Sequence, residues 1–230
     1  MAHREFKDKL YPEFARVAQA LASDRRLELV DLLAQAPRRV EALADETGMT
    51  IANVSQHLQV LKNARLVASE RRGTTVTYRL ASAGVVALWL ALRDVAEDRL
   101  PEIGRLRAQF AGTTDETLSR DELQSLLSRG RAVLVDVRPA IEFESGHISG
   151  AMPIPIEELE KRLKELPRNK RIVAYCRGAY CLFADEAVAL LRKRGFDAVR
   201  LEGGWPEWEA EGRAVSKSGA LRGRLPSPFS

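Results

Sequence analysis

The sequence predicts two domains: a mainly α-helical N-terminal domain with a winged helix-turn-helix, and a C-terminal α/β domain with a parallel sheet. Two observations predict this fold class. Apolar residues recur at helical spacing before about residue 112. Beyond that point, short apolar runs at 132–137, 171–176 and 198–201 alternate with helical segments, as they do in parallel α/β sheets.

The predicted boundaries follow from local composition. We expect an N-terminal domain over 1–112, a second domain over 113–215 and a disordered tail over 216–230. The segment AGTTDET at 111–117 is small and polar, which is typical of a linker, and the tail has two late prolines and few apolar anchors. With 230 residues, the chain is long enough for two small domains that each bury a core.

Composition narrows the class of protein. The chain is 45% hydrophobic and 30% charged, as ordinary globular proteins are. Its longest apolar stretch, 85–92, is far shorter than the roughly 20 residues that cross a bilayer, and the first ten residues lack an apolar signal region. We therefore expect a cytoplasmic protein with no membrane partner. Two cysteines and three histidines, none spaced as a ligand set, predict neither a metal site nor a cofactor.

Residues 40–64 have the signals of a helix-turn-helix. A helix over 40–48 is expected to stop at Gly48, and Thr50 is a suitable N-cap for the next helix. The apolar face of that second helix is predicted to consist of Ile51, Val54, Leu58 and Leu61. The side chains expected to meet base edges and phosphates in a major groove are Thr50, Asn53, Ser55, Gln56, His57 and Lys62.

A predicted β-hairpin follows this helix. Strands at 66–70 and 75–80 flank the turn Arg71-Arg72-Gly73, and a basic turn beside a recognition helix is suited to backbone phosphates. Each feature alone also fits a common helical hairpin or a solvated arginine pair. The helix-turn-helix and the basic hairpin together favour DNA binding.

The run ALADETGMTIANVSQHLQVLKNARLVASERRGTTVTYRL resembles the ArsR-type winged-helix repressors, and the resemblance covers about residues 10–100. It implies a homodimer, formed here by the helical segments 5–22 and 82–108, that binds a double-stranded operator. Many members of that family sense metals through cysteines in this domain. This chain has no cysteine there, so we expect the signal to arise in the C-terminal domain.

Cys176 ends an apolar strand and precedes a glycine-containing loop and a helix at about 184–194. The carboxyl end of a parallel strand is where open α/β sheets bind ligands. A helix N-terminus, loop N–H groups and the adjacent Arg177 would lower the pKa of the thiol, which predicts a reactive thiolate. The alternative is that Cys176 is a small buried apolar residue, as most free cysteines are.

Two further segments, VLVDVRPAIEFESGHISGAMPIP and IVAYCRGAYC…AVALLRKRGFDAVRLEGGWPEW, resemble the rhodanese domain over about 115–215. The resemblance implies that Cys176 carries sulfane sulfur as a persulfide. Four residues match the largely structural first signature of that family: Asp136, Arg138, Glu142 and His147. For His147 we expect a scaffold role rather than proton transfer. Trp205 and Trp208 are expected to be core and rim aromatics.

The cysteine loop departs from the family pattern Cys-x-x-Gly-x-Arg. The residues assigned to it are Cys176, Arg177, Gly178, Ala179, Tyr180 and Cys181. Cys181 stands where the pattern has arginine, and the loop is longer, which suggests a wider pocket and casts doubt on thiosulfate activity. Cys181 fits two interpretations: a resolving thiol for Cys176, or a core residue at the start of the next helix.

These features favour a DNA-binding regulator that responds to sulfane sulfur or redox state through Cys176. An alternative is a sulfurtransferase with a tethered, autoregulatory DNA-binding module. A third is a thiol-dependent reductase of an oxyanion such as arsenate, with Cys181 as resolving thiol, although the missing loop arginine counts against it. The expected partners are operator DNA, a second copy of the chain, and a small sulfur donor or thiol acceptor.

Overall fold

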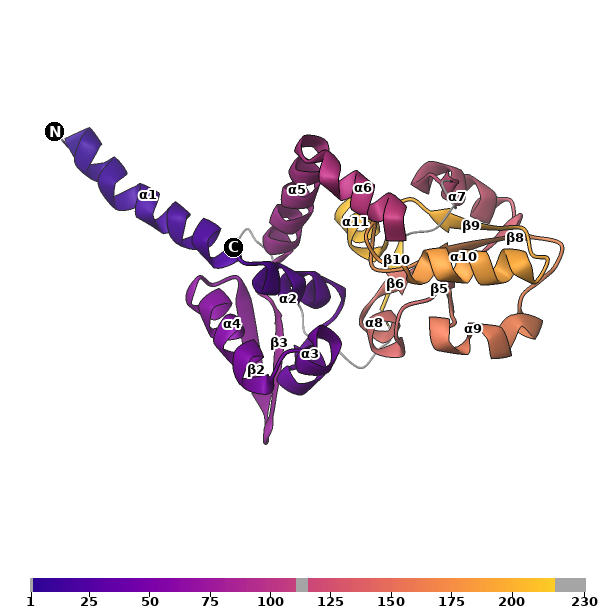
Figure 1. Cartoon of the computed structure of the whole chain (residues 1–230), viewed down its shortest axis with the longest axis horizontal. Helices are drawn as coiled ribbons and strands as arrows, with labels where there is room; N and C mark the ends of the chain where they lie inside the picture. Colours follow the sequence, from indigo (N-terminus) through magenta and orange to yellow (C-terminus); the bar gives the residue numbers. More distant parts are fainter. Residues whose placement is uncertain (1, 111–115, 218–230) are drawn as a thin grey trace. The chain divides into compact units, whose positions relative to one another are not determined.

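The computed structural model describes residues 2–110 and 116–217, which fall into two compact units divided between Trp89 and Leu90 (Figure 1). This division lies inside a helix, upstream of the domain boundary expected at residue 112. Residues 111–115, which contain that expected boundary and most of the expected linker, lie outside the described residues. The boundary at 112 therefore stays a prediction, whereas the two-part fold class is confirmed.

The first unit is mainly helical, with a small antiparallel sheet in the order β1-β3-β2. Its elements are α1 (Ala2–Leu21), α2 (Asp24–Gln35), β1 (Arg38–Arg39), α3 (Val40–Thr47), α4 (Ile51–Asn63), β2 (Val67–Arg72), β3 (Thr75–Leu80) and the first part of α5 (Ala83–Arg99). The helix-turn-helix is α3 and α4. Gly48, with φ 65°, ends α3, because a left-handed backbone costs glycine little.

The start of α4 follows from its capping residue. The Thr50 side chain accepts a hydrogen bond from the Asn53 backbone N–H at 3.2 Å, which confirms the expected N-cap. Three of the four predicted apolar residues, Val54, Leu58 and Leu61, have no exposed surface. Ile51 is 54% exposed, so its assignment to the buried face is wrong. Side chains lean toward the N-terminus of a helix, and Ile51, the first residue of α4, therefore leans past the end of the helix.

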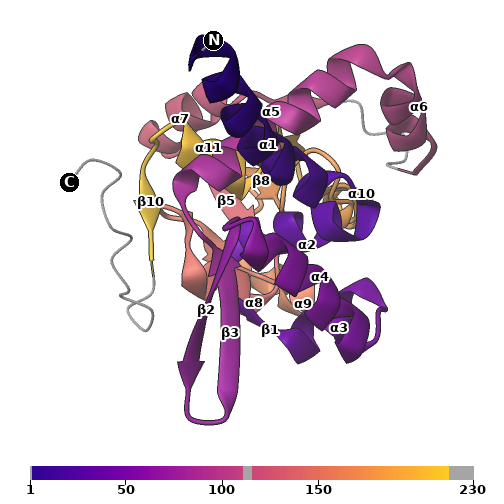
Figure 2. The same ribbon diagram turned by 90° about the vertical axis from the view of Figure 1, so that its left-hand side faces the viewer.

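The hairpin expected after α4 is present, but its turn lies later than predicted. Arg72 pairs with Thr75 across β2 and β3, so the turn consists of Gly73 and Thr74. Arg71 and Arg72 belong to β2 rather than to the turn. Figure 2 shows the hairpin extending beyond the helices of its own unit, which leaves its tip open to an external partner.

The two helical segments assigned to dimerisation differ in outcome. The segment expected at 5–22 corresponds to α1. The segment expected at 82–108 is two helices, α5 and α6 (Pro101–Phe110), rather than one. Pro101 is the first residue of α6, a position that suits proline because the first helical N–H has no partner within its helix.

The second unit contains the remaining elements around a five-stranded parallel sheet in the order β4-β9-β8-β5-β7. This unit begins with the last part of α5 and the whole of α6. Its other elements are β4 (Thr117–Leu118), α7 (Arg120–Ser128), β5 (Ala132–Asp136), α8 (Ala140–Ser145), β6 (His147–Ile148), β7 (Met152–Pro153), α9 (Ile156–Arg162), a 3₁₀ turn (Leu163–Glu165), β8 (Arg171–Tyr175), α10 (Phe183–Lys193), β9 (Ala198–Leu201), α11 (Trp205–Ala210) and β10 (Val215–Ser216). The three apolar runs seen in the sequence are β5, β8 and β9, the middle of this sheet.

Helices cover both faces of the sheet, as Figure 1 shows. On one face, α9 and α10 bury apolar residues such as Leu159 and Val188 against Ile172. On the other face, α7 and α11 bury apolar residues such as Leu123 and Trp205 against the sheet. The central strand, β8, is therefore covered on both sides. The residue that follows it, Cys176, begins its loop at the middle of the sheet edge.

Order at the C-terminal end extends further than predicted. Ser216 belongs to β10, which pairs antiparallel with β6, and its hydroxyl lies 3.0 Å from that of Ser149. Lys217 forms an ion pair with Glu209 at 3.1 Å. The prediction of disorder is therefore wrong for Ser216, which completes a small sheet, and for Lys217, which forms the ion pair, and 218–230 lie outside the described residues. Among the residues described, no helix has the length and apolar character to span a bilayer.

Candidate functional sites: the recognition helix and the cysteine loop

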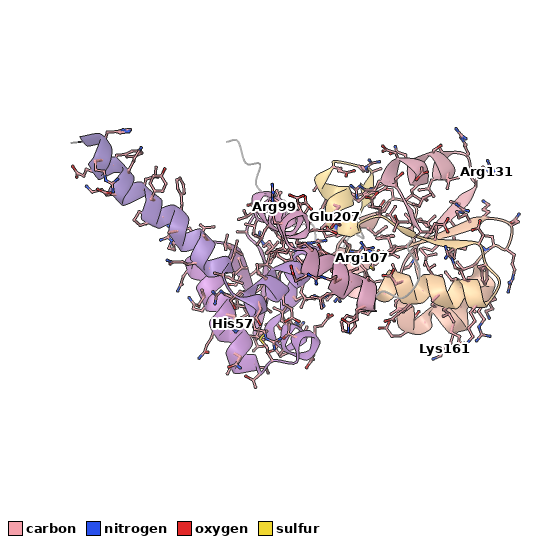
Figure 3. The ribbon with its side chains drawn as sticks, turned by 45° about the horizontal axis from the view of Figure 1, so that its top comes forward. His57, Arg99, Arg107, Arg131, Lys161 and Glu207 are labelled. Carbon is pink, nitrogen blue, oxygen red and sulfur yellow. The ribbon has the colours of Figure 1, made fainter. Side chains whose placement is uncertain are left out.

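The residues predicted to face DNA lie on α4 and on the hairpin, and all but one are exposed. The exposed ones are Thr50, Asn53, Ser55, Gln56, Lys62, Arg71 and Arg72; His57, labelled in Figure 3, is half-buried. Two hydroxyls are used within the helix: Thr50 caps it, and the Ser55 hydroxyl donates to the Ile51 carbonyl at 2.8 Å. The amide side chains of Asn53 and Gln56 remain the best candidates for base contacts.

The charged side chains of the hairpin are fixed by short contacts. The Lys62 ammonium donates to the Ser69 hydroxyl at 2.8 Å, which ties α4 to β2. Arg72 pairs with Glu70 at 2.7 Å, whereas the Arg71 Nε donates to the Gly73 carbonyl at 3.1 Å. Because Glu70 offsets the charge of Arg72, Arg71 contributes more net positive charge to the hairpin tip. We name the exposed tip around Gly73 the wing.

The cysteine loop, residues 176–182, joins β8 to α10. Cys176 is fully buried, and its Sγ donates to the Cys181 carbonyl at 3.2 Å. Burial raises the pKa of the Cys176 thiol well above its usual value. This burial opposes the thiolate expected at Cys176, which stays a prediction, as does the wider pocket expected from the longer loop. The sulfur lies in the apolar core beneath α10, where loss of hydration outweighs the nearby loop and helix N–H groups.

Arg177 does not act on Cys176 as predicted. Its guanidinium binds the fully buried Glu142 carboxylate, with Nη2 and Nε at 2.6 and 2.9 Å from Oε1. A buried carboxylate needs such a partner, because an unpaired charge in the interior is very costly. The positive charge of Arg177 is thus committed to α8, and this contact fixes the first turn of the loop.

Cys181 has the opposite character to Cys176. It is half-buried just ahead of α10, and both cysteines are free thiols. A hydrogen bond from the Cys176 side chain lowers the pKa of Cys181, and the backbone N–H groups of Arg177 and Phe183 lower it further, against partial burial. Of the two thiols, Cys181 is the one that ionises more readily. The loop therefore holds two neighbouring thiols whose pKa values are shifted in opposite directions.

Sequence reasoning missed a buried arginine under this loop. Arg200, on β9, is 1% exposed, and its Nη2 donates to the carbonyls of Gly178 and Ala179 at 3.1 and 3.0 Å. Its Nη1 lies 3.6 Å from the Asp185 carboxylate on α10. The loop lacks its own terminal arginine, and the neighbouring strand supplies a guanidinium from below instead. In the sequence, this buried arginine could have been recognised only as a charged residue within the otherwise apolar run AVRL.

The GGWPEW segment was not assigned a role at the loop, yet it packs directly against it. A Cβ on Gly204 would lie 2.3 Å from the Cys176 carbonyl oxygen and 2.4 Å from the Gly178 nitrogen, so only glycine fits. The Trp205 backbone N–H donates to that same Cys176 carbonyl at 3.2 Å. Gly178, with φ 142°, supplies the second place where the backbone requires glycine. The Gly204 and Trp205 contacts hold the backbone at the start of the loop against the start of α11.

Asp136 and Arg138 form a buried network at the end of β5. Arg138 binds Asp136 with Nη2 at 2.6 Å and Nε at 3.0 Å, and it also donates to the Gly146 carbonyl at 2.8 Å. The Tyr175 hydroxyl donates to the same carboxylate at 2.5 Å. Because Tyr175 immediately precedes Cys176, this network fixes the end of β8 from which the loop starts.

The His147 side chain contacts Phe143 of α8 rather than Cys176 or Cys181. Its Nδ1 lies 2.8 Å from the Phe143 carbonyl, and its ring stacks on that of Phe143 with centroids 3.7 Å apart. These contacts hold the ring against α8, and the scaffold role expected for His147 stays a prediction. Across residues 2–110 and 116–217, the structure contains no group of three or more His, Cys, Asp or Glu side chains that could hold a metal ion.

The fold and the two sites define the class of this protein: a winged helix-turn-helix unit joined to a rhodanese-like α/β unit. Residues 23–69 match the family of bacterial regulatory proteins of the arsR type, and 119–211 match the rhodanese-like domain. The chain is 43% identical over 211 residues to the HTH-type transcriptional regulator Rv0324 of Mycobacterium tuberculosis, covering 92% of this chain and 93% of that one. It belongs to the arsR family of transcriptional regulators, in a form that carries a rhodanese-like domain.

Other relatives match one half of the chain. The probable adenylyltransferase/sulfurtransferase MoeZ of M. tuberculosis is 38% identical over 96 residues, which are 40% of this chain and 24% of that one. A solved homodimeric winged helix-turn-helix DNA-binding domain, Mb0332 from Mycobacterium bovis, is 45% identical and covers 41% of this chain and 87% of its own, with a TM-score of 0.40.

Proposed function

We propose that this regulator binds operator DNA as a cytoplasmic homodimer and responds to sulfane sulfur or oxidation through the pair Cys176 and Cys181. The observation that carries the proposal is the inequality of the two thiols. Cys176 is sealed and protonated, whereas Cys181 is half-buried with a lowered pKa and hydrogen-bonded to Cys176. A pair of this kind favours reaction at Cys181 first, with Cys176 as the second thiol.

The chemistry that suits this pair has two balanced steps. In the first, the Cys181 thiolate attacks a sulfur of a polysulfide, whose S–S bond breaks. A persulfide forms on Cys181, and the shortened polysulfide leaves with the electron pair. In the second, Cys176 gives up its proton to the departing outer sulfur as its own sulfur attacks the Cys181 sulfur of that persulfide. The products are a Cys176–Cys181 disulfide and hydrosulfide, which takes the proton of the Cys176 thiol. Roles for the two cysteines are thus reversed from those expected from the sequence.

Sealing of Cys176 counts against the sulfurtransferase alternative. A persulfide carrier must receive sulfur from one substrate and present it to another, which requires an accessible sulfur. Because the Cys176 residue has no exposed surface, turnover of thiosulfate with cyanide is expected to be slow. Robust turnover that is lost in Cys176→Ala would favour the enzyme over the sensor.

DNA binding and dimerisation are supported by the first unit. The exposed polar face of α4 and the wing have the chemistry that reads a groove and contacts phosphates. On α1, three aromatic side chains, Phe6, Tyr11 and Phe14, are each about 60% exposed. Exposed apolar side chains along one helix are typical of a surface that is covered in the assembled protein. The M. bovis relative is described as homodimeric, which agrees with this proposal.

The test combines mass and DNA affinity on the full-length protein. A duplex from the region upstream of its own gene is titrated with reduced and with polysulfide-treated protein. The treated wild type is expected to show either added sulfur on Cys181 or the disulfide, together with a changed affinity. Cys181→Ser should lose both responses, whereas Cys176→Ser should retain added sulfur without a disulfide. An affinity that does not change in the modified wild-type protein would end the sensing proposal.

A further inference from the structure

The second half of α5 contacts the cysteine loop through two side chains one helical turn apart. Arg93 is 8% exposed, and its Nη2 pairs with the Glu207 carboxylate of α11 at 3.0 Å. The Arg93 guanidinium carbon also lies 4.9 Å from the centre of the Tyr180 ring, which belongs to the loop. Figure 3 labels Glu207 on α11 and Arg99 at the end of α5. All of these residues belong to the second unit.

Glu97, four residues beyond Arg93, holds the other end of the same loop residue. The Glu97 carboxylate is close enough to the Tyr180 hydroxyl to raise its pKa through hydrogen bonding and charge. Partial burial and this carboxylate raise the pKa of Tyr180 to about 12, so the phenol keeps its proton at neutral pH and remains a donor. Residues at i and i+4 share a helix face, so Arg93 and Glu97 both contact Tyr180 from α5.

The Arg93 guanidinium also rests on the loop backbone. A Cβ on Gly178 would lie 3.3 Å from both terminal nitrogens of Arg93 and 3.1 Å from the Glu207 Oε1. The Gly178 carbonyl in turn accepts the Cys181 N–H at 3.3 Å. A shift of the loop at Gly178 therefore disturbs Cys181 and the Arg93–Glu207 pair together.

Joining the two sulfurs requires such a shift. The Cys176 Sγ now donates to the Cys181 carbonyl oxygen. A disulfide needs the sulfurs about 2.05 Å apart with a torsion near 90°. That hydrogen bond must break, and the four residues between the cysteines, which include Gly178 and Tyr180, must adjust.

The helix that carries Arg93 begins in the first unit. Val85, at the start of α5, is buried in the same apolar core as Val54 and Leu58 of α4. One residue before the division between the units, the Trp89 indole N–H donates to the Asp31 carboxylate of α2 at 2.8 Å. A helix is a stiff element held by continuous backbone hydrogen bonds. The first turns of α5 thus belong to the core of the first unit, and its later turns contact the cysteine loop within the second unit.

We propose that Arg93, through Tyr180 and Glu207, is the positioning residue that transmits the state of the cysteine loop to α5 and so to the DNA-reading unit. This inference rests on the sensing function proposed above and assigns its route. Linkage requires reciprocity: if the modified loop changes DNA affinity, bound DNA must change the equilibrium between the modified and the unmodified loop by the same factor. Both effects must then depend on Arg93.

The experiment compares wild type, Arg93→Gln and a matched control, Arg99→Gln, all as full-length protein. Arg99 lies on the same helix, but its side chain is 79% exposed and pairs with the adjacent Asp98. Each protein is titrated with the duplex from upstream of its own gene, before and after polysulfide treatment, and the mass of each treated sample is recorded. Coupling between sites typically changes affinity by about 5–150-fold, so wild type and Arg99→Gln should shift within that range. Arg93→Gln should gain the same mass with little or no shift.

The outcomes separate the two proposals. If wild type and Arg93→Gln shift equally, the route through Arg93 is wrong and the sensing function stands. If the modified wild type does not shift, the sensing function is wrong and the route falls with it. Tyr180→Phe keeps the ring but removes the hydrogen bond to Glu97, and a reduced shift is expected there even if Arg93→Gln does not fold. As a reciprocal readout, the duplex should change the equilibrium ratio of disulfide to dithiol in wild type but not in Arg93→Gln.

Discussion

The arginines of the wing and those of the cysteine loop differ in what surrounds them. The Arg72 side chain is 72% exposed and pairs with Glu70, which is also exposed, so this contact is readily exchanged for a phosphate. Arg177 is half-buried and binds a buried carboxylate, and Arg200 is buried and binds two loop carbonyls. The exposed arginine of the wing is suited to bind an external polyanion such as DNA. The two arginines at the cysteine loop instead stabilise one conformation of that loop.

The largest effect is expected where a buried charge loses its partner. Arg138→Met should lower the free energy of unfolding of the second unit by about 3–5 kcal/mol, because Asp136 stays buried without its ion pair. Urea unfolding followed by tryptophan fluorescence reports this, since Trp205 and Trp208 are both buried there. Arg131→Met is the control: this exposed residue should change stability by no more than about 0.5 kcal/mol. Equal losses in both variants would erase the contrast between buried and exposed arginines.

A second prediction sharpens the contrast within the loop itself. The pKa of Cys181 lies below the usual value and that of Cys176 well above it, so alkylation of Cys181 should rise and level off at lower pH. A gap of about one pKa unit already gives about tenfold more thiolate at a pH below both values. Peptide mass spectrometry after iodoacetamide pulses between about pH 6 and 10 follows each site separately.

Cys176→Ala tests the cause of the lowered pKa of Cys181. It removes the hydrogen bond that contributes most to the lowered pKa of Cys181, so the Cys181 profile should move to higher pH. Alkylation of Cys176 before Cys181 in the wild type would show that the sealed thiol is in fact the reactive one.

The smallest expected effect lies at the wing. Arg71→Ala should reduce the slope of log affinity against log salt by about 0.9 for the phosphate contact it removes. Arg72→Ala should reduce it less, because Glu70 already offsets that charge. Fluorescence anisotropy across a salt series measures both slopes, with the exposed Arg25→Ala on α2 as control. If Arg72→Ala proves the stronger of the two, the Glu70 pair does not persist near DNA.

Much of the fold could be predicted because its signals are local. The N-cap at Thr50, the glycine stop at Gly48 and the three apolar strands depend on a few adjacent residues. The boundaries that moved depend on more distant partners. Ser216 is ordered because it pairs with His147, which lies far from it along the chain. The hairpin turn shifted to Gly73 and Thr74 because strand register is set across both strands.

At the cysteine loop, residue types were predictable and their states were not. The sequence alone determined that Cys176 follows a buried strand, that a second thiol lies five residues on, and that a helix-turn-helix with a basic hairpin precedes them. Tertiary structure decided which thiol ionises, where the charge of Arg177 goes, and that Arg200 and Arg93 support the loop from β9 and α5. A pKa depends on hydration and on neighbours within a few ångströms, and strand order and helix packing choose those neighbours.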